Sequence, residues 1–151
     1  MASFICSKVL GNFNILVDHS LGLKQMVDLG RYSYINENIS PKIFPKTAKG
    51  KINYDTKLIY FFKYINSVDA LKDLDIEGLR PATIEELLAF GAQYSEFQIK
   101  FPIFALGSPC DILGIRQIPY LGGVHHKERT LSLYYWDYLW MGSYSFLVIP
   151  K

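Results

Sequence analysis

The sequence has little of what marks a secreted, membrane or metal-bound protein. Only two of its 151 residues are cysteines, Cys6 and Cys110, and their spacing gives no reason to expect a disulfide. We expect two unpaired thiols in a reducing compartment. The N-terminus has no basic segment followed by a long apolar one, so we expect no signal peptide. No apolar run is long enough to span a membrane. The expected location is the cytoplasm, or the cell surface if a partner displays the chain.

An excess of charge of one sign is also missing. Lys and Arg number 16 and Asp and Glu number 14, which gives a net charge of +2. That balance is too even to argue for nucleic acid or an anionic membrane as a partner. A length of 151 residues predicts one domain, which buries roughly 70% of its unfolded surface and needs no metal or disulfide to fold. We expect no cofactor.

Recognisable catalytic machinery is absent as well. The glycines form no phosphate-binding fingerprint. His125 and His126 are the only paired imidazoles. Neighbouring residues of an extended segment point to opposite faces, so the two do not readily hold one metal ion. We interpret them as solvated loop histidines, with a small enzyme that uses either one kept as an alternative. Glu85 and Glu86 are interpreted as helix-surface carboxylates that serve capping and solubility.

What the sequence does have is aromatic side chains, which make up 15% of its residues. The C-terminal run 131–151 holds both tryptophans, Trp136 and Trp140, and several tyrosines among Asp, Gly and Ser. Such rings give large, rigid contact area with few torsions to freeze, and the small residues give adaptable hydrogen bonding. The composition is typical of a recognition surface, so the sequence predicts a binding module and not an enzyme.

Hydrophobic periodicity and capping signals predict an α+β fold, with two or three helices packed on a mainly antiparallel sheet. Apolar side chains at even positions from Ile52 to Tyr64 predict a long, half-buried strand or hairpin arm. Thr83 and Glu86 form a capping box at the start of the best-marked helix. The other expected elements are a strand at 13–17, a helix at 20–29, a helix at 68–75 capped by Ser67, and short strands within 101–106, 115–121, 131–133 and 146–149.

One basic stretch, residues 42–63, keeps another class of function open. Its lysines lie near Tyr54, Tyr60 and Phe61, and lysines interleaved with aromatics can form a platform for single-stranded nucleic acid. The simpler interpretation is that the aromatics belong to the core while the lysines face solvent. We therefore expect no nucleic-acid partner and keep this stretch as an alternative.

The order of segments from Arg80 onward carries a family resemblance. Residues 80–89, Arg-Pro-Ala-Thr-Ile-Glu-Glu-Leu-Leu-Ala, resemble the helix start of C-type-lectin-fold domains of the formylglycine-generating type. Apolar segments then alternate with loops up to an aromatic loop and a closing strand, 145–151. Over residues 78–151 the chain is similar to the variable proteins of diversity-generating retroelements, most of all to archaeal and candidate-phylum members. The resemblance implies a single C-type-lectin-like domain over residues 1–151.

In that family, error-prone reverse transcription changes adenines in a template copy, which is then written into the 3′ end of the gene. The resemblance therefore implies a ligand-binding protein whose surface loops vary between gene copies, with an unknown protein or cell-surface ligand as its partner. Favoured AAY codons can change to Tyr, Asp, Ser, Gly, His, Cys, Ile or Val, but not to Trp, Met, Lys, Gln or Glu. The residues of the three expected loops, 109–112, 122–126 and 134–144, that pass this filter are Cys110, Asp111, Ile112, Gly122, Gly123, Val124, His125, His126, Tyr134, Tyr135, Asp137, Tyr138, Gly142, Ser143 and Tyr144.

Three residues of the aromatic loop fail the filter, and the resemblance implies that they are fixed scaffold: Trp136, Trp140 and Met141. The strands at 115–121 and 146–149 would form the rigid support beneath the loops. Two departures limit what the resemblance implies. The calcium- and sugar-binding triplets of animal C-type lectins are absent, so we expect no calcium-dependent sugar binding. The paired cysteines of formylglycine-generating enzymes are absent too, so we expect no oxidase activity.

Overall fold

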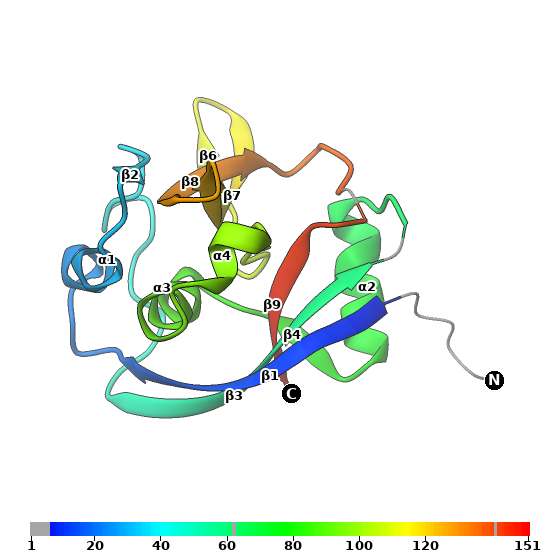
Figure 1. The fold of residues 1–151 in the computed structure, drawn as a ribbon, viewed down its shortest axis with the longest axis horizontal. Coiled ribbons are helices and arrows are strands. Elements are labelled where there is room, and N and C mark those ends of the chain that lie inside the picture. The colour runs from blue at the N-terminus through cyan, green and yellow to red at the C-terminus, as the bar shows by residue number, and fades with distance from the viewer. Residues whose placement is uncertain (1–6, 62, 141) are drawn as a thin grey trace.

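A curved sheet runs through the protein, with helices on both sides of it (Figure 1). A computed structural model describes residues 7–61, 63–140 and 142–151. The strands are β1 (Ser7–Asp18), β2 (Tyr34–Ile35), β3 (Lys51–Phe61), β4 (Leu79–Pro81), β5 (Ile103–Phe104), β6 (Cys110–Ile112), β7 (Ile115–Val124), β8 (Glu128–Tyr135) and β9 (Ser145–Pro150). The helices are α1 (Leu23–Gly30), α2 (Ser67–Ile76), α3 (Ile84–Gln93) and α4 (Phe97–Lys100).

The expected α+β class is confirmed. In the described residues, four helices pack on a nine-stranded sheet of order β1-β3-β9-β5-β7-β8-β2, with β4 beside β9 and β6 beside β7. Most neighbouring strands are antiparallel, and the pairs β5–β9 and β2–β8 are parallel. There is one helix more than expected because α4 is a single turn, which is too short to leave a periodic signal in the sequence.

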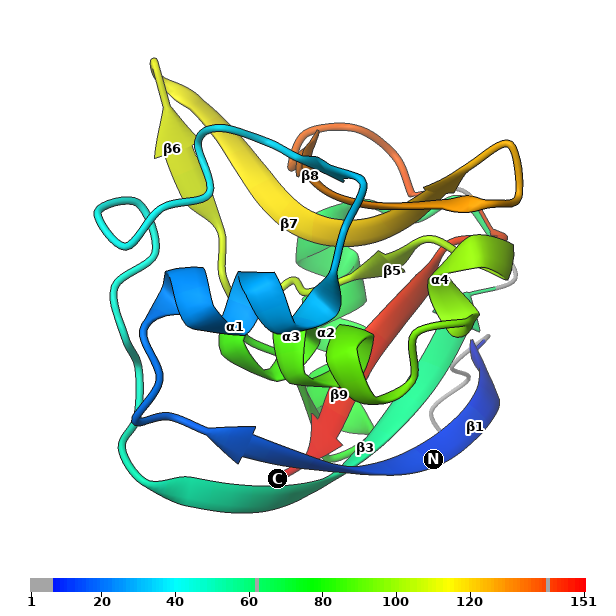
Figure 2. The same cartoon turned by 60° about the vertical axis from the view of Figure 1, so that its left-hand side comes forward.

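The closing strand β9 lies in the middle of the sheet, and both of its faces are buried. Leu147 and Ile149 pack in a cluster with α1 and α3, whereas Phe146 and Val148 pack in a second cluster with α2. Figures 1 and 2 show α1 and α3 on one side of β9 and α2 on the other. The sequence of β9 is apolar at successive positions because a strand covered on both faces has no solvent side.

Strand β3 follows the expected alternation only in its first half. Tyr54 and Leu58 face the α1–α3 cluster, as a period of two predicts. Ile59 and Phe61 are also buried, but they pack in the α2 cluster. The expectation of a half-buried strand is therefore right for its first half and wrong for its second, where α2 covers the other face. Residue 62 lies outside the described residues.

Strand β1 is longer than the expected 13–17 and forms an edge of the sheet. Side chains at the end of α3 close part of that edge. The Gln93 amide accepts from the backbone N–H of Leu16 at 3.0 Å and donates to its carbonyl at 2.7 Å. The Tyr94 hydroxyl donates to the Asn14 carbonyl at 2.9 Å. These bonds occupy backbone groups of the edge strand that could otherwise pair with a strand of another chain.

The capping box of α3 is confirmed, but its two carboxylates are buried. Glu86 accepts from the backbone N–H of Thr83 at 2.8 Å and from both terminal nitrogens of Arg80, at 3.0 and 2.8 Å. Glu85 is only 2% exposed and accepts from both the backbone N–H and the hydroxyl of Thr47. The expectation of surface carboxylates is wrong because residues 31–50 fold over this face of α3.

Glu85 also faces a buried histidine. Nδ1 of His19 lies 3.4 Å from Oε1 of Glu85 without a hydrogen bond between them, and Nε2 lies 3.1 Å from the Tyr54 hydroxyl. The backbone N–H of His19 donates to the carbonyl of Gly50 at 2.8 Å. Polar contacts thus join the end of β1, the start of β3 and the first turn of α3.

Helix α2 uses a different cap from the one expected. The side-chain oxygen of Asn66 accepts from the backbone N–H of Asp69 at 2.8 Å, which makes Asn66 the N-cap. Ser67, expected in that role, is buried within the first turn. Its hydroxyl donates to the carbonyl of Trp136 at 2.8 Å and accepts from the indole N–H of Trp140 at 2.8 Å. Ser67 therefore holds the aromatic loop against the protein.

Candidate ligand-binding cleft

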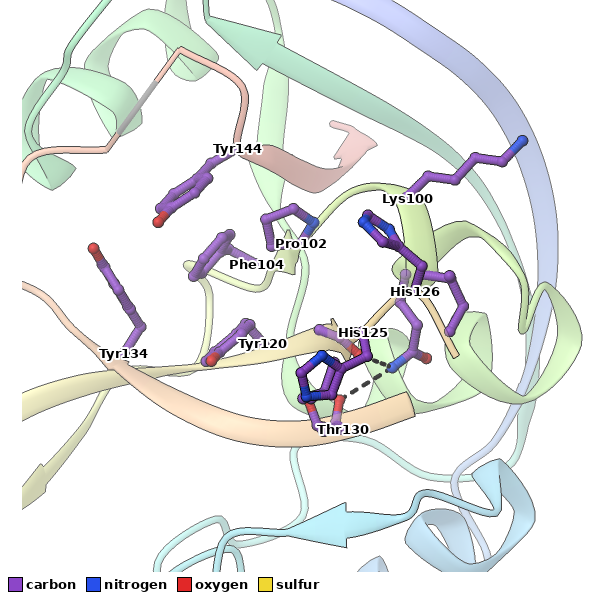
Figure 3. Close-up of a pocket in the computed structure, with 14 residues that line it drawn as sticks. Lys100, Pro102, Phe104, Tyr120, His125, His126, Thr130, Tyr134 and Tyr144 are labelled. Atoms are coloured by element: carbon purple, nitrogen blue, oxygen red, sulfur yellow. Dashed lines mark hydrogen bonds between the residues drawn. The ribbon is translucent and has the colours of Figure 1, made fainter. Parts of the chain in front are cut away.

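A cleft of about 430 Å³ opens between α4, the β7–β8 hairpin and the segment that leads into β9 (Figure 3). This volume falls within the range of about 300–1,000 Å³ that is usual for small-molecule sites. The residues that line it are Gln98, Ile99, Lys100, Pro102, Phe104, Tyr120, Gly122, Gly123, Val124, His125, His126, Thr130, Tyr134 and Tyr144. Half of them belong to the expected segments 122–126 and 134–144, so the fold brings these two segments together.

The base of the cleft is an aromatic stack. Phe104 is buried, and the rings of Tyr120 and Tyr144 stack on it at centroid distances of 4.9 and 5.1 Å. Tyr134 meets Phe104 edge to face at 5.5 Å. All three tyrosines remain partly exposed. Aromatic pairs in these geometries add to the stability that burial alone provides, so the cleft has a rigid base.

The tyrosine hydroxyls are held in their protonated form. Figure 3 shows the hydroxyl ends of Tyr134 and Tyr144 turned toward each other. Burial and, to a smaller extent, a hydrogen bond with Tyr144 raise the pKa of Tyr134 to about 12. Burial also raises the pKa of Tyr120, with a smaller contribution from Tyr144. At neutral pH these side chains are therefore uncharged groups that can both donate and accept hydrogen bonds.

One rim of the cleft is the tip of the β7–β8 hairpin. His125 and His126 have φ angles of 53° and 56°, and the backbone N–H of Lys127 donates to the carbonyl of Val124 at 3.1 Å, which closes the turn. Histidine adopts this left-handed conformation more readily than most residues. Both histidines are exposed, as expected, but they border the cleft. Figure 2 shows this hairpin tip close to α4.

One wall of the cleft contains a buried glutamine, Gln98. The Gln98 amide donates to the carbonyls of Gly122, at 2.9 Å, and Thr130, at 3.1 Å, and it accepts from Arg129 at 2.9 Å. Arg129 also donates to the carbonyls of Gly30, Gly91 and Ser95. Neither residue was expected from the sequence, since a polar side chain gives no local sign that it will be buried among distant carbonyls.

Two of the expected variable positions leave little space for a side chain. A Cβ atom on Gly123 would lie 3.1 Å from Cα of Ile99 and 3.2 Å from the Gln98 carbonyl oxygen, both backbone atoms of α4. A Cβ on Gly122, which is buried, would lie 2.9 Å from the ring of Tyr120 and 3.1 Å from the Thr130 hydroxyl. Gly122 is buried and so does not lie on the surface, whereas Gly123 is exposed and its lack of a side chain lets the hairpin approach α4 closely.

The aromatic loop beside the cleft is attached at Trp140. This side chain is fully buried and contacts the rings of Phe104, Tyr134, Tyr144 and Phe146. Its backbone exchanges two hydrogen bonds with Ile65, at 3.2 and 2.7 Å, in addition to the indole bond to Ser67. Trp136 is half-buried under the Arg116 guanidinium, at 5.4 Å. Met141 lies outside the described residues.

Between these two tryptophans the loop is exposed. Tyr135 and Tyr138 are 41% and 52% exposed, and their rings contact each other at 4.8 Å. Leu139 is 57% exposed. Asp137 and Ser143 are exposed, and Gly142 is half-buried. The loop thus presents an accessible aromatic surface that continues from the tyrosines of the cleft, because Tyr138 also contacts Tyr134.

The third expected segment, 109–112, does not join the cleft. Residues 110–112 form β6, which pairs with the end of β7 opposite the hairpin tip (Figure 2). Cys110 is buried in the α1–α3 cluster, where burial raises the pKa of its thiol to about 11, so its position on a binding surface is wrong. Asp111 is exposed and pairs with Arg116 at 3.6 Å, and Ile112 is half-buried.

The geometry gives little support to the two alternatives, an enzyme site at the paired histidines and a nucleic-acid platform at residues 42–63. Among the described residues, no group of three or more His, Cys, Asp and Glu side chains lies close enough to hold a metal ion. In the 42–63 stretch, Phe61 is buried. Tyr54 is partly covered, with Arg80 5.8 Å from its ring centre. Phe61 therefore offers no open face to a nucleic-acid base, and Arg80 lies over one face of Tyr54, while Tyr60 is half-buried.

The comparisons with known proteins add no family assignment. No protein-family model matches the chain, and neither a curated protein nor a solved structure matches it. Across the part of the chain that the structure describes, no helix is long and apolar enough to cross a membrane. The functional argument therefore rests on the cleft and on the loop beside it.

Proposed function

We propose that this chain is a ligand-binding protein of C-type-lectin-like fold, akin to the variable proteins of diversity-generating retroelements. Its binding surface would consist of the cleft and the exposed loop 135–139. The observation that carries the proposal is the meeting of two segments, 122–126 and 134–144, at one cleft. Both segments have the residue types that adenine mutagenesis produces, and both present most of these side chains to solvent.

The support beneath this surface favours the proposal. A surface that changes in sequence needs a core that does not depend on the changing residues. Phe104, Trp140 and Phe146 are buried directly beneath the tyrosines, and the loop is held by Ser67 of α2 and by Ile65, which precedes that helix. Tyr135 and Tyr138 can therefore change without opening the core.

The structure narrows the set of positions that would vary. We leave out Cys110 and Gly122 because they are buried, and Gly123 because a side chain there would press on the backbone of α4. Asp111 and Ile112 lie at the far end of β7 and would belong to a separate edge. The positions that remain are Val124, His125, His126, Tyr134, Tyr135, Asp137, Tyr138, Gly142, Ser143 and Tyr144.

Binding to arrayed purified proteins and glycans, chosen from those displayed on cell surfaces, tests the binding role. We expect targets bound by the natural protein to be lost in the variant His126→Asn/Tyr135→Ser/Tyr138→Ser, since all three side chains are exposed on the proposed surface. The control variant Lys72→Ser/Glu77→Ser changes exposed positions on and just after α2 and should retain the same targets. The reverse pattern, with loss in the control and retention in the surface variant, would contradict the proposal.

A further inference from the structure

The formal charge in the lining of the cleft comes from one lysine, with two histidines beside it. Its lining includes three basic side chains, Lys100, His125 and His126, and no Asp or Glu. Glu128 follows on the same hairpin but does not line the cleft. In a protein with almost balanced charge, a cleft without carboxylates has a potential that favours an anion. The basic groups also come from two elements, α4 and the β7–β8 hairpin, that meet across the opening.

The basic and aromatic groups occupy different ends of the cleft. Figure 3 shows His125, His126 and Lys100 toward one end and Tyr134 and Tyr144 toward the other, with the ammonium group of Lys100 directed outward. A lysine stem is flexible, so this ammonium group can turn toward a bound anion. The aromatic end has stacked rings and protonated hydroxyls but no charge.

A cationic ligand fits this arrangement poorly. Aromatic cages bind ammonium groups through the faces of their rings, but Phe104 stacks against one face of Tyr120 and one face of Tyr144. The remaining faces would have to attract a cation beside Lys100 and two histidines, and no carboxylate among the described lining residues would offset the lysine charge. A neutral ligand would leave the basic end without a partner.

We propose that the cleft binds a ligand in which an anionic group, a carboxylate or a phosphate, is attached to a body the size of one ring. The anionic group lies between Lys100 and the histidines of the hairpin tip, and the ring lies against Tyr120, Tyr134 and Tyr144. This inference rests on the proposed binding function, because it names the chemistry recognised by part of the same surface. The exposed loop 135–139 would contact whatever carries that group.

Two pairs of small probes, matched in shape and different in charge, test the inference. Benzoate is compared with benzamide, and phenyl phosphate with phenol, by following backbone amide resonances of the full-length protein during titration. We expect at least one anionic probe to bind about tenfold more tightly than its neutral partner. The resonances of Gly122, Gly123 and residues 125–126 should shift, and added salt should weaken binding. The stronger of the two anionic probes distinguishes a carboxylate from a phosphate.

Two variants test which basic side chains favour the anionic probe, and a third variant is the control. Lys100→Gln and His125→Asn/His126→Asn should each reduce the preference for the anionic probe severalfold. Asn is chosen for the hairpin because it tolerates the left-handed backbone of both positions. The control is Lys127→Gln, an exposed lysine on the same hairpin that does not line the cleft, and it should retain the full preference.

The outcomes separate this inference from the proposed function. Equal binding of charged and neutral probes at the cleft would overturn the preference for an anion while leaving a binding site in place. No shift of cleft resonances with any of the four probes would overturn the inference as a whole. The array measurement tests the broader binding role independently, because it also detects targets that bind to loop 135–139 alone.

Discussion

Trp140 is the residue on which the aromatic loop depends most. Its ring is fully buried among Phe104, Tyr134, Tyr144 and Phe146, and its indole N–H is bonded to Ser67. Trp140→Ala should therefore lower the free energy of unfolding by about 3–5 kcal/mol, as expected for loss of a large buried ring. The neighbouring Leu139→Ala, 57% exposed, should change it by less than about 0.5 kcal/mol. Urea denaturation measures both, and similar losses in the two variants would refute the anchoring role.

Tyr134 should make the protein sensitive to alkaline pH. Burial raises its pKa to about 12, whereas tyrosines of an unfolded chain ionise near pH 10. Because the folded state holds this proton more tightly, the stabilising contribution is complete below about pH 10 and is lost as the pH rises toward 12. Tyr32, whose pKa burial also raises to about 12, contributes in the same window.

The difference between variants isolates the contribution of Tyr134. Free energies of unfolding are measured at several pH values between about 9 and 12 for the natural protein, for Tyr134→Phe and for Tyr135→Phe. We expect a shallower fall for Tyr134→Phe than for the natural protein. Tyr135 is more exposed, and its variant should follow the natural curve. Parallel curves for the natural protein and Tyr134→Phe would contradict the prediction.

Among the elements, α3 has one feature that its own sequence predicts and another that depends on distant segments of the chain. The capping box of Thr83 and Glu86 is visible in the sequence because both partners lie within one turn, and the structure has it. The burial of Glu85 was not predictable in the same way. It depends on Thr47 and His19, which reach it from segments far away in the chain. The same limit explains why Ser67 was interpreted as a cap and not as a partner of Trp140.

Glu85 offers a test of that buried contact between elements. Glu85→Ala removes the acceptor for both the backbone N–H and the hydroxyl of Thr47, and it leaves His19 buried without its neighbour. We expect a loss of about 2–4 kcal/mol in the free energy of unfolding, because buried polar groups are left without partners. Glu77→Ala, at the exposed end of α2, should cost less than about 0.5 kcal/mol. A loss as small for Glu85→Ala would show that the contact contributes little.

At the scale of the whole molecule, the sequence predicted the class of fold, and two of the three expected segments meet at one cleft. The short apolar stretches after α3 form strands at the expected places, and β9 is buried as its composition indicates. The expectation that segment 109–112 joins the other two failed because of the sheet topology. Because β6 folds back on the start of β7, it lies at the end of that strand opposite the hairpin tip. Sequence order alone does not contain this information.

The residues that shape the cleft from behind were missed for a related reason. Gln98, Arg129 and Gly123 act through close packing between α4 and the β7–β8 hairpin. Each has an ordinary sequence context, and its role depends on neighbours 24 or more residues away. The surface side chains were easier to anticipate because composition alone distinguishes them from the core. The exposed side chains of the cleft and its loop could therefore be anticipated from the sequence, whereas the packing beneath them is apparent only in the folded structure.

Sequencing the 3′ end of this gene in many copies from the population that carries it tests the central claim most directly. We predict amino-acid differences concentrated at the exposed positions of the surface, Val124, His125, His126, Tyr135, Asp137, Tyr138 and Ser143. The same copies should retain Trp140, Ser67 and Gly123, whose replacement would open the core or push the hairpin away from α4. Differences spread evenly along the chain, or as frequent at Trp140 and Gly123 as at Tyr138, would contradict the account.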